Sequence, residues 1–182
     1  MSRLLLAVSA SAAIHKACDL ASKLTQAGHE VRVLQTSNAA RLVAPQLFQA
    51  LTGQSARVSE FGDEREGGMD HISLAHWAQA MVFAPVTAAA LARLANGSGA
   101  DLISTVALAM KRDVPRLLCP AMNPTMYSHP AVQRNVTRCC EDGWQLMVPA
   151  AGRLACDEEG PGRLPEVPEI LDRVGELLGQ EE

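Results

Sequence analysis

The chain has 182 residues, which suits one domain with a sizeable hydrophobic core. A net charge of −4 and an aromatic content of 3% argue against a nucleic-acid-binding surface, which needs a basic excess and stacking rings. Five cysteines in no CxxC pattern make a disulfide framework or a zinc site unexpected.

Short, continuous apolar runs predict parallel strands that are covered on both faces. They occupy Leu4–Val8, Glu30–Leu34, Ala80–Ala84, Arg116–Cys119 and Trp144–Val148, with a shorter strand at Arg57–Ser59. The first run is too short for a signal-peptide core or a membrane span. We therefore expect a cytoplasmic protein that does not contact a membrane.

Helical patterns alternate with these strands. They cover Ile14–Ala27, Ala39–Leu51, Met69–Trp77, Thr87–Ala95, Asp101–Met110, Pro130–Glu141 and Glu169–Leu178. A strand-helix-strand order with tight turns predicts right-handed parallel units. We therefore expect a single α/β domain over residues 1–182, with a Rossmann-like parallel sheet and helices on both faces.

Hydroxyl side chains gather where predicted strands end or helices begin: Ser9, Ser11, Thr36, Thr87 and Ser104. Ligands of open α/β sheets bind beyond the carboxyl ends of the strands, and helix starts with nearby hydroxyls suit a phosphate. Each residue taken alone is better explained as an ordinary helix cap. Their joint placement favours a mononucleotide, while the missing G-x-G-x-x-G pattern argues against a dinucleotide bound in the usual Rossmann manner.

The segment Pro120–Tyr127 follows a predicted buried strand and contains two prolines that stop regular structure. It leaves the amide of Asn123 and the side chains of Met122 and Met126 at the end of the strand. A primary amide can donate to a carboxylate and accept from an amide or a thiol. The segment predicts a substrate clamp, and an ordinary strand-to-helix loop is the alternative.

Two further side chains are candidates for proton transfer. His71 is a candidate acid or base because an imidazole side chain can exchange protons near neutral pH, although a surface or capping histidine is the more frequent explanation of a lone histidine. Cys156 lies in a glycine- and proline-rich segment, 151–168, that we expect to form a mobile flap. The adjacent acids Asp157 and Glu158 favour its protonated thiol, which could then donate a proton, although an incidental loop cysteine fits equally well. The other cysteines are expected to be small buried apolar residues, at positions 18, 119, 139 and 140.

Taken together, these segments resemble the flavin-dependent cysteine decarboxylases. The resemblance runs from about Leu4 to Pro165, and the order and spacing of its motifs are specific. The motifs are His71–Leu74 with Trp77, Ala84–Thr87, Gly99–Thr105, Pro120–Asn123 with Met126, and Ala155–Cys156 with Gly160–Leu164.

The resemblance implies a flavodoxin-like sheet with FMN bound between the subunits of a homotrimer, and some members assemble four trimers into a dodecamer. It assigns the catalytic base to His71, the carboxylate clamp to Asn123 and a proton donor to Cys156. Substrate contacts would come from Asn123, Met126 and Cys156. The residues expected to contact FMN are Ser9, Ser11, Thr36, Pro85, Thr87, Ser104, Ala121 and Met122.

The chemistry of this family explains these residue types. FMN accepts a hydride equivalent from the carbon that bears sulfur, and the resulting thioaldehyde accepts the electrons released when CO₂ leaves. We expect the substrate to be the C-terminal cysteine of a ribosomally made peptide, giving an aminoenethiol. One alternative is phosphopantothenoylcysteine of coenzyme A biosynthesis. Two others are a non-catalytic FMN-binding regulatory subunit and another FMN-fold transferase, such as a flavin prenyltransferase.

The sequence departs from the family pattern at three places. Ser9-Ala10 stands where a glycine-serine pair is usual, and Ala88-Ala89 where Ala-Asn is frequent, so two expected FMN contacts are lost. Asp157 replaces the usual glycine after the flap cysteine. Together with the expectation of a free-standing domain, since bacterial coenzyme A enzymes are commonly fused to a synthetase, the altered flap favours a peptide substrate.

Overall fold

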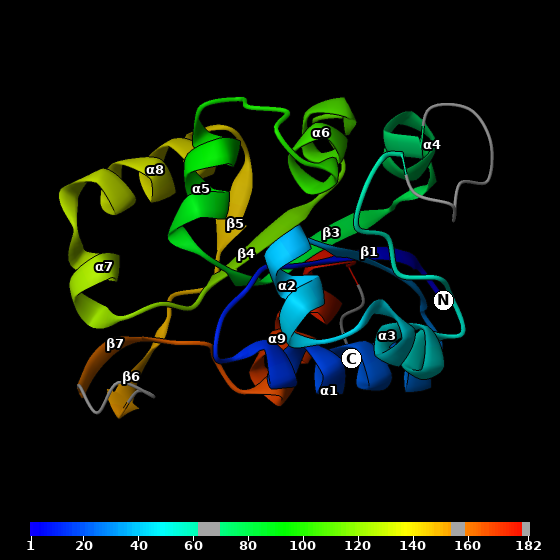
Figure 1. Cartoon of the computed structure of the whole chain (residues 1–182), viewed down its shortest axis with the longest axis horizontal. Helices are drawn as coiled ribbons and strands as arrows, with labels where there is room; N and C mark the ends of the chain where they lie inside the picture. Colours follow the sequence, from blue (N-terminus) through cyan, green and yellow to red (C-terminus); the bar gives the residue numbers. More distant parts are fainter. Residues whose placement is uncertain (62–69, 154–158, 180–182) are drawn as a thin grey trace.

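The computed structural model describes residues 1–61, 70–153 and 159–179, and the account below is confined to these. Its centre is a five-stranded parallel sheet in the order β2-β1-β3-β4-β5 (Figure 1). The strands are β1 (Arg3–Val8), β2 (Glu30–Gln35), β3 (Ala80–Val86), β4 (Arg116–Pro120) and β5 (Trp144–Leu146). This strand order is the flavodoxin-like one, so the predicted fold class is confirmed.

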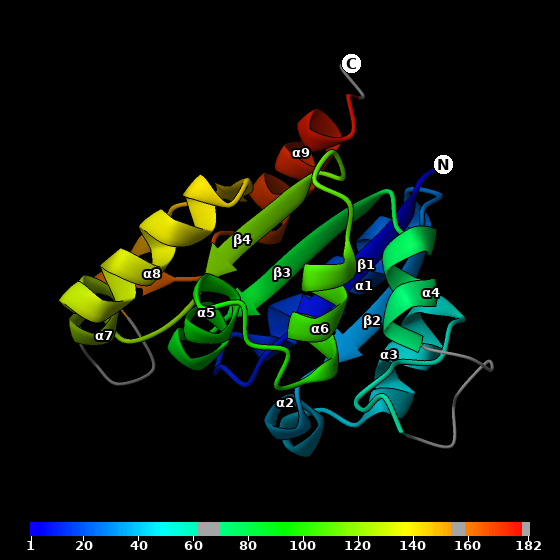
Figure 2. The same cartoon turned by 90° about the horizontal axis from the view of Figure 1, so that it is seen from above.

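Helices cover both faces of the sheet (Figures 1 and 2). One face carries α1 (Ile14–Gln26), α3 (Pro45–Thr52) and α9 (Val167–Leu177). The other carries α4 (Asp70–Trp77), α5 (Ala88–Ala95), α6 (Leu102–Ala109) and α8 (Pro130–Glu141).

Strand β1 shows why both faces are apolar. Leu4, Leu6 and Val8 pack in the core beneath α1, while Leu5 and Ala7 pack in the core on the opposite face. Successive side chains of a strand point to opposite faces, so a run without polar residues requires a cover on each side.

Several predicted boundaries were wrong. The expected helix Ala39–Leu51 is two helices, α2 (Ser37–Leu42) and α3, because Pro45 disfavours helical backbone in the residue before it. The expected strand Arg57–Ser59 is a single bridge from Arg57 to Leu34. The last strand of the sheet is shorter than predicted and ends at Leu146.

The glycine- and proline-rich segment contains regular structure at both of its ends. Strands β6 (Ala150–Arg153) and β7 (Glu159–Arg163) pair antiparallel, and α9 begins at Val167. Cys156 lies between the two strands, outside the described residues. Within the ranges described, no helix is both long and apolar enough to cross a bilayer.

The four described cysteines only partly match expectation. Cys119 and Cys139 are buried as predicted, whereas Cys18 is half-buried and Cys140 is exposed. Burial raises the pKa of the Cys119 thiol, and burial with nearby negative charge raises the pKa of Cys139 to about 12. Both buried thiols therefore stay protonated at neutral pH and act as small packing residues.

Candidate functional site

The carboxyl ends of β1 and β3 form the switch point of the sheet. The two strands are neighbours, but β1 leads into α1 on one face and β3 leads into α5 on the other. Chains that diverge in this way leave a crevice at the end of the sheet, which is where open α/β proteins bind ligands.

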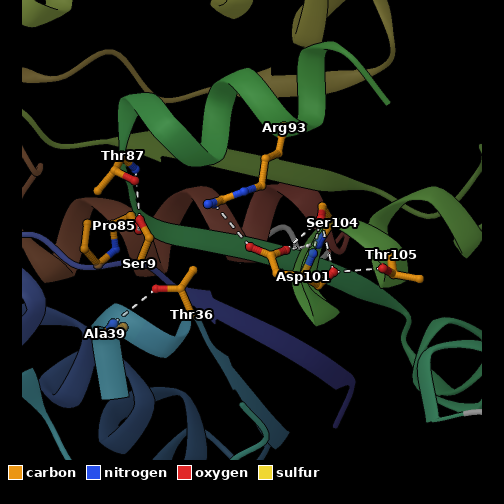
Figure 3. A network of polar contacts seen from close by, with 9 residues as sticks. All are labelled: Ser9, Thr36, Ala39, Pro85, Thr87, Arg93, Asp101, Ser104 and Thr105. Atoms are coloured by element: carbon orange, nitrogen blue, oxygen red, sulfur yellow. Dashed lines mark hydrogen bonds and ion pairs between the residues drawn. The ribbon is translucent and has the colours of Figure 1, made fainter. Parts of the chain in front are cut away.

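Ser9 connects the two sides of this switch point (Figure 3). Its hydroxyl donates to the carbonyl oxygen of Pro85 at 2.9 Å and accepts from the backbone N–H of Thr87 at 2.9 Å. The Ser9 side chain is buried, and its own N–H also donates to Pro85 at 3.1 Å. The turn after β1 and the turn after β3 are therefore held as one unit.

Two more predicted residues extend this unit to the strands on either side. Thr36 follows β2; its N–H donates to Val8 at 3.0 Å and its hydroxyl accepts from Ala39 at 3.1 Å. The Ser11 hydroxyl donates to the carbonyl oxygen of Ala121, beyond β4, at 3.3 Å. The structure thus brings together all of the predicted FMN contacts except one, namely Ser9, Ser11, Thr36, Pro85, Thr87, Ala121 and Met122.

The exception is Ser104, whose hydroxyl lies in a separate polar cluster (Figure 3). It donates to Asp101 Oδ1 at 2.6 Å and forms the capping box that begins α6, and Arg93 pairs with Asp101 at 3.3 Å. The hydroxyl is therefore engaged in capping the start of α6, and helix capping was the alternative explanation for each hydroxyl.

The start of α5 fits the phosphate of FMN. Thr87 precedes this helix, but its side chain makes no capping hydrogen bond. The first N–H groups of a helix have no partner inside the helix, and together with the helix dipole they attract an anion. The neighbouring residues Ala88 and Ala89 have methyl side chains, so an anion can approach the backbone closely.

Asn123 follows β4, which ends at Pro120, and caps the start of the short helix α7 (Pro124–Ser128), which the sequence did not predict. Its Oδ1 accepts from the N–H groups of Thr125 at 2.8 Å and Met126 at 3.3 Å. Because the amide oxygen caps the helix, the NH₂ end of the amide is turned away from it. Met126 is 48% exposed on the same short helix.

The antiparallel strands β6 and β7 form a hairpin, and β7 lies beside the loop that follows β4. The N–H of Met122 donates to the carbonyl oxygen of Gly162 in β7 at 3.0 Å. Lys16 in α1 donates to the carbonyl oxygen of Leu164 at 3.1 Å and to Glu166 at 2.8 Å, which fixes the chain just after β7. Lys16 was not among the predicted site residues, although a lysine in the first turn of the helix after β1 can be recognised in the sequence.

His71 lies in the first turn of α4, near two acidic residues. Its Nδ1 is 3.4 Å from Oε1 of Glu60, a neighbour for which the sequence carried no signal. The preceding residue, Asp70, is buried and pairs with the buried Arg57 at 3.2 Å. This ion pair fixes the start of α4 and with it the backbone of His71.

His71 and Asn123 do not meet within one chain. Figures 1 and 2 both place α4 and α7 on opposite sides of the molecule. A single copy therefore presents the histidine and the amide on separate surfaces.

The chain is similar to known flavoproteins over nearly its whole length. The model of the family described as Flavoprotein matches residues 1–179. The coenzyme A biosynthesis bifunctional protein CoaBC of Bacillus subtilis is 42% identical over 178 residues, which are 98% of this chain but 43% of that protein. The chain thus spans less than half the length of this relative.

Two further proteins match along their whole length. A probable phosphopantothenoylcysteine decarboxylase of Streptococcus mutans is 35% identical over 176 residues, covering 97% of this chain and 98% of that one. The crystal structure of SpaF, one of the FMN-dependent cysteine decarboxylases, superposes with a TM-score of 0.83 at 31% identity and covers 99% and 97% of the two chains.

Proposed function

Because the chain belongs to the flavoprotein family, we propose that it binds FMN and decarboxylates a cysteine carboxylate. The observation that carries this proposal is the linked set of turns at the switch point, where Ser9 joins Pro85 and Thr87 beside the uncapped start of α5. A relative named as a decarboxylase matches end to end, and SpaF is named as an FMN-dependent cysteine decarboxylase.

The turns after β1, β2, β3 and β4 would hold FMN. Bound there, FMN supplies a two-electron acceptor for the carbon next to sulfur, which makes loss of CO₂ possible. The NH₂ group of Asn123 would hold the substrate carboxylate; the support is that the oxygen of the same amide caps α7. His71 would remove or shuttle the proton, and Glu60 would orient its ring.

We further propose that the site is completed by a second copy of the chain in a homo-oligomer, a trimer or a dodecamer built from trimers. The support is the separation of α4 and α7 within one chain (Figures 1 and 2). A cyclic assembly would repeat the contact of the His71 surface of one copy with the Asn123 surface of the next.

Two substrates fit the proposal, each for its own reason. The altered flap residue Asp157 and the match to SpaF favour the C-terminal cysteine of a peptide. The names of the Bacillus and Streptococcus relatives favour phosphopantothenoylcysteine, and the match covers 98% of the second relative. In either case the cysteine carboxylate is the group that reacts.

The decisive experiment begins with the colour of the purified protein. We expect a flavin absorbance band and release of FMN on heating. The protein is then incubated separately with a cysteine-terminated peptide and with phosphopantothenoylcysteine, and the products are weighed by mass spectrometry. Loss of CO₂ from one of them supports the proposal and identifies the substrate; a colourless protein that takes up no flavin contradicts it.

A further inference from the structure

A second cavity lies at the amino edge of the sheet, the end of the strands away from the proposed FMN site. It has a volume of about 500 Å³ and is bounded by α5, α6 and α8 and by the first residues of β4 and β5. Its charged lining residues are four arginines and two acids, namely Arg93, Arg112, Arg116, Arg138, Glu141 and Asp142. The proposed decarboxylation uses none of them.

The charge of this lining is opposite in sign to that of the whole chain. Arg93 is neutralised by its ion pair with Asp101. The three remaining arginines face two acids, so the lining is positive although the chain carries −4. Arg112 and Arg138 form no ion pair with any described residue. A concave surface of one sign concentrates ions of the other sign.

Arg116 gives the cavity a buried cation. Its side chain lies against the ring of Trp144, with Cζ 5.6 Å from the ring centre, and the residue is 7% exposed. One Nη donates to the carbonyl oxygen of Asp142 at 3.4 Å, while Nε is buried with no hydrogen-bond partner among the described residues. A buried guanidinium with an unused donor is costly unless an anion accompanies it.

The neighbours of Arg116 strengthen this argument. Burial lowers the pKa of Arg116; Asp142 raises it and the like charge of Arg112 lowers it further. Two guanidinium groups are thus held within electrostatic reach of each other at the wall of a cavity. An anion between them would remove their repulsion and accept their hydrogen bonds.

We propose that this cavity binds a small phosphate-bearing anion through Arg112, Arg116 and Arg138. Phosphate suits the site because guanidinium groups bind its oxygens in pairs, and three cations around one cavity favour a doubly charged ligand. The volume lies within the roughly 300–1,000 Å³ of small-molecule sites. The inference is independent of the proposed function, because this cavity and the proposed FMN site lie at opposite ends of the sheet.

The test uses the protein saturated with FMN, so that the flavin site does not contribute. Pyrophosphate and adenosine monophosphate are titrated separately at low salt, and binding is followed by calorimetry. We expect one site per chain for at least one of the two probes. Tighter pyrophosphate indicates a free polyphosphate, and tighter adenosine monophosphate indicates a phosphate ester.

Substitutions of the lining arginines test whether the probes bind in this cavity. Arg112→Gln and Arg138→Gln should each weaken it about fivefold, the effect of losing one partly exposed charge contact. Arg134→Gln is the matched control, because it removes an exposed arginine of α8 that does not line the cavity. No binding of either probe to the wild-type protein, or an equal loss of affinity in the control, would overturn the proposal.

Discussion

Gly160 in β7 lies directly against Pro124 at the start of α7. A β-carbon at Gly160 would lie 3.0 Å from Cβ and 3.1 Å from Cγ of Pro124, so that Pro124 would have to move by a few tenths of an ångström. Next to this contact, Met122 donates to Gly162 at 3.0 Å. The hairpin and the loop that carries Asn123 therefore form one packed unit.

Gly160→Ala should separate the hairpin from this loop. We expect kcat for decarboxylation to fall by about tenfold or more, because a small displacement of a positioning group is costly, while FMN is retained. Gly28→Ala is the control: Gly28 also has a positive φ, of 87°, but a β-carbon there meets nothing within 4 Å. Both variants should lose about 1 kcal/mol of stability, and only the first should lose activity. A wild-type kcat for Gly160→Ala would contradict the coupling.

The proposed assembly predicts complementation between two inactive variants. His71→Asn and Asn123→Ala should each abolish decarboxylation and keep the yellow colour. When the two are mixed under conditions of subunit exchange, about a quarter of the shared sites should regain both intact residues, and a similar share of activity should return. A mixture that stays inactive after exchange, checked by mass spectrometry of the oligomers, would show that the two residues do not share a site.

The sequence predicted the strands and the position of the site for a physical reason. A run such as Leu4–Val8 needs cover on both faces, and parallel strands bring their carboxyl ends to one edge, so Ser9 and Thr87 had to meet there. Ser104 lies apart from these residues in a capping box, which the sequence could not indicate because a hydroxyl that caps a helix and one that binds a ligand look alike in sequence. The contact of Glu60 with His71 follows from the path of the chain in space, which no local pattern records.

Ser9→Ala should weaken both the fold and FMN binding. The substitution leaves the N–H of Thr87 without its acceptor, whereas Pro85 still accepts from the Ser9 N–H. Leaving one donor unsatisfied costs about 1–3 kcal/mol, measurable by urea unfolding of the apoprotein. Ser22→Ala, which removes a surface contact with Gln26 in α1, should change stability by less than about 0.5 kcal/mol. Equal effects of the two substitutions would contradict a linking role for Ser9.

Substitution of two aspartates compares the stability contribution of a buried ion pair with that of an exposed one. The Asp70–Arg57 pair is 6% and 8% exposed, and the Asp19–Lys23 pair is 50% and 41% exposed. Asp70→Asn removes the carboxylate charge from this buried ion pair and should cost about 3 kcal/mol. Asp19→Asn should cost less than about 0.5 kcal/mol, because water screens that pair. Chemical denaturation gives the free energy of unfolding of both variants. Similar losses of this free energy would mean that the Arg57 pair does not fix α4.

The last prediction concerns the contact that holds the chain after β7. The hydrogen bond and positive charge of Lys16 lower the pKa of the Glu166 carboxyl below its ordinary value of 4.5, and Arg163 adds to this. A pKa that is lower in the folded state adds stability above the unfolded value, and this stability disappears as the pH falls through the folded value. Glu166→Gln should therefore unfold at a lower temperature than the wild type at pH 7.

The difference in unfolding temperature should shrink as the pH falls below the ordinary range of a glutamate, because the wild-type carboxyl then also becomes neutral. Asp172→Asn, on the same helix and outside any ion pair of the described residues, is the control and should show no such convergence. Since the Glu166 side chain is 56% exposed, high salt should also reduce the difference at pH 7. A difference that persists unchanged at low pH would mean that Glu166 acts through the capping box of α9 and not through its charge.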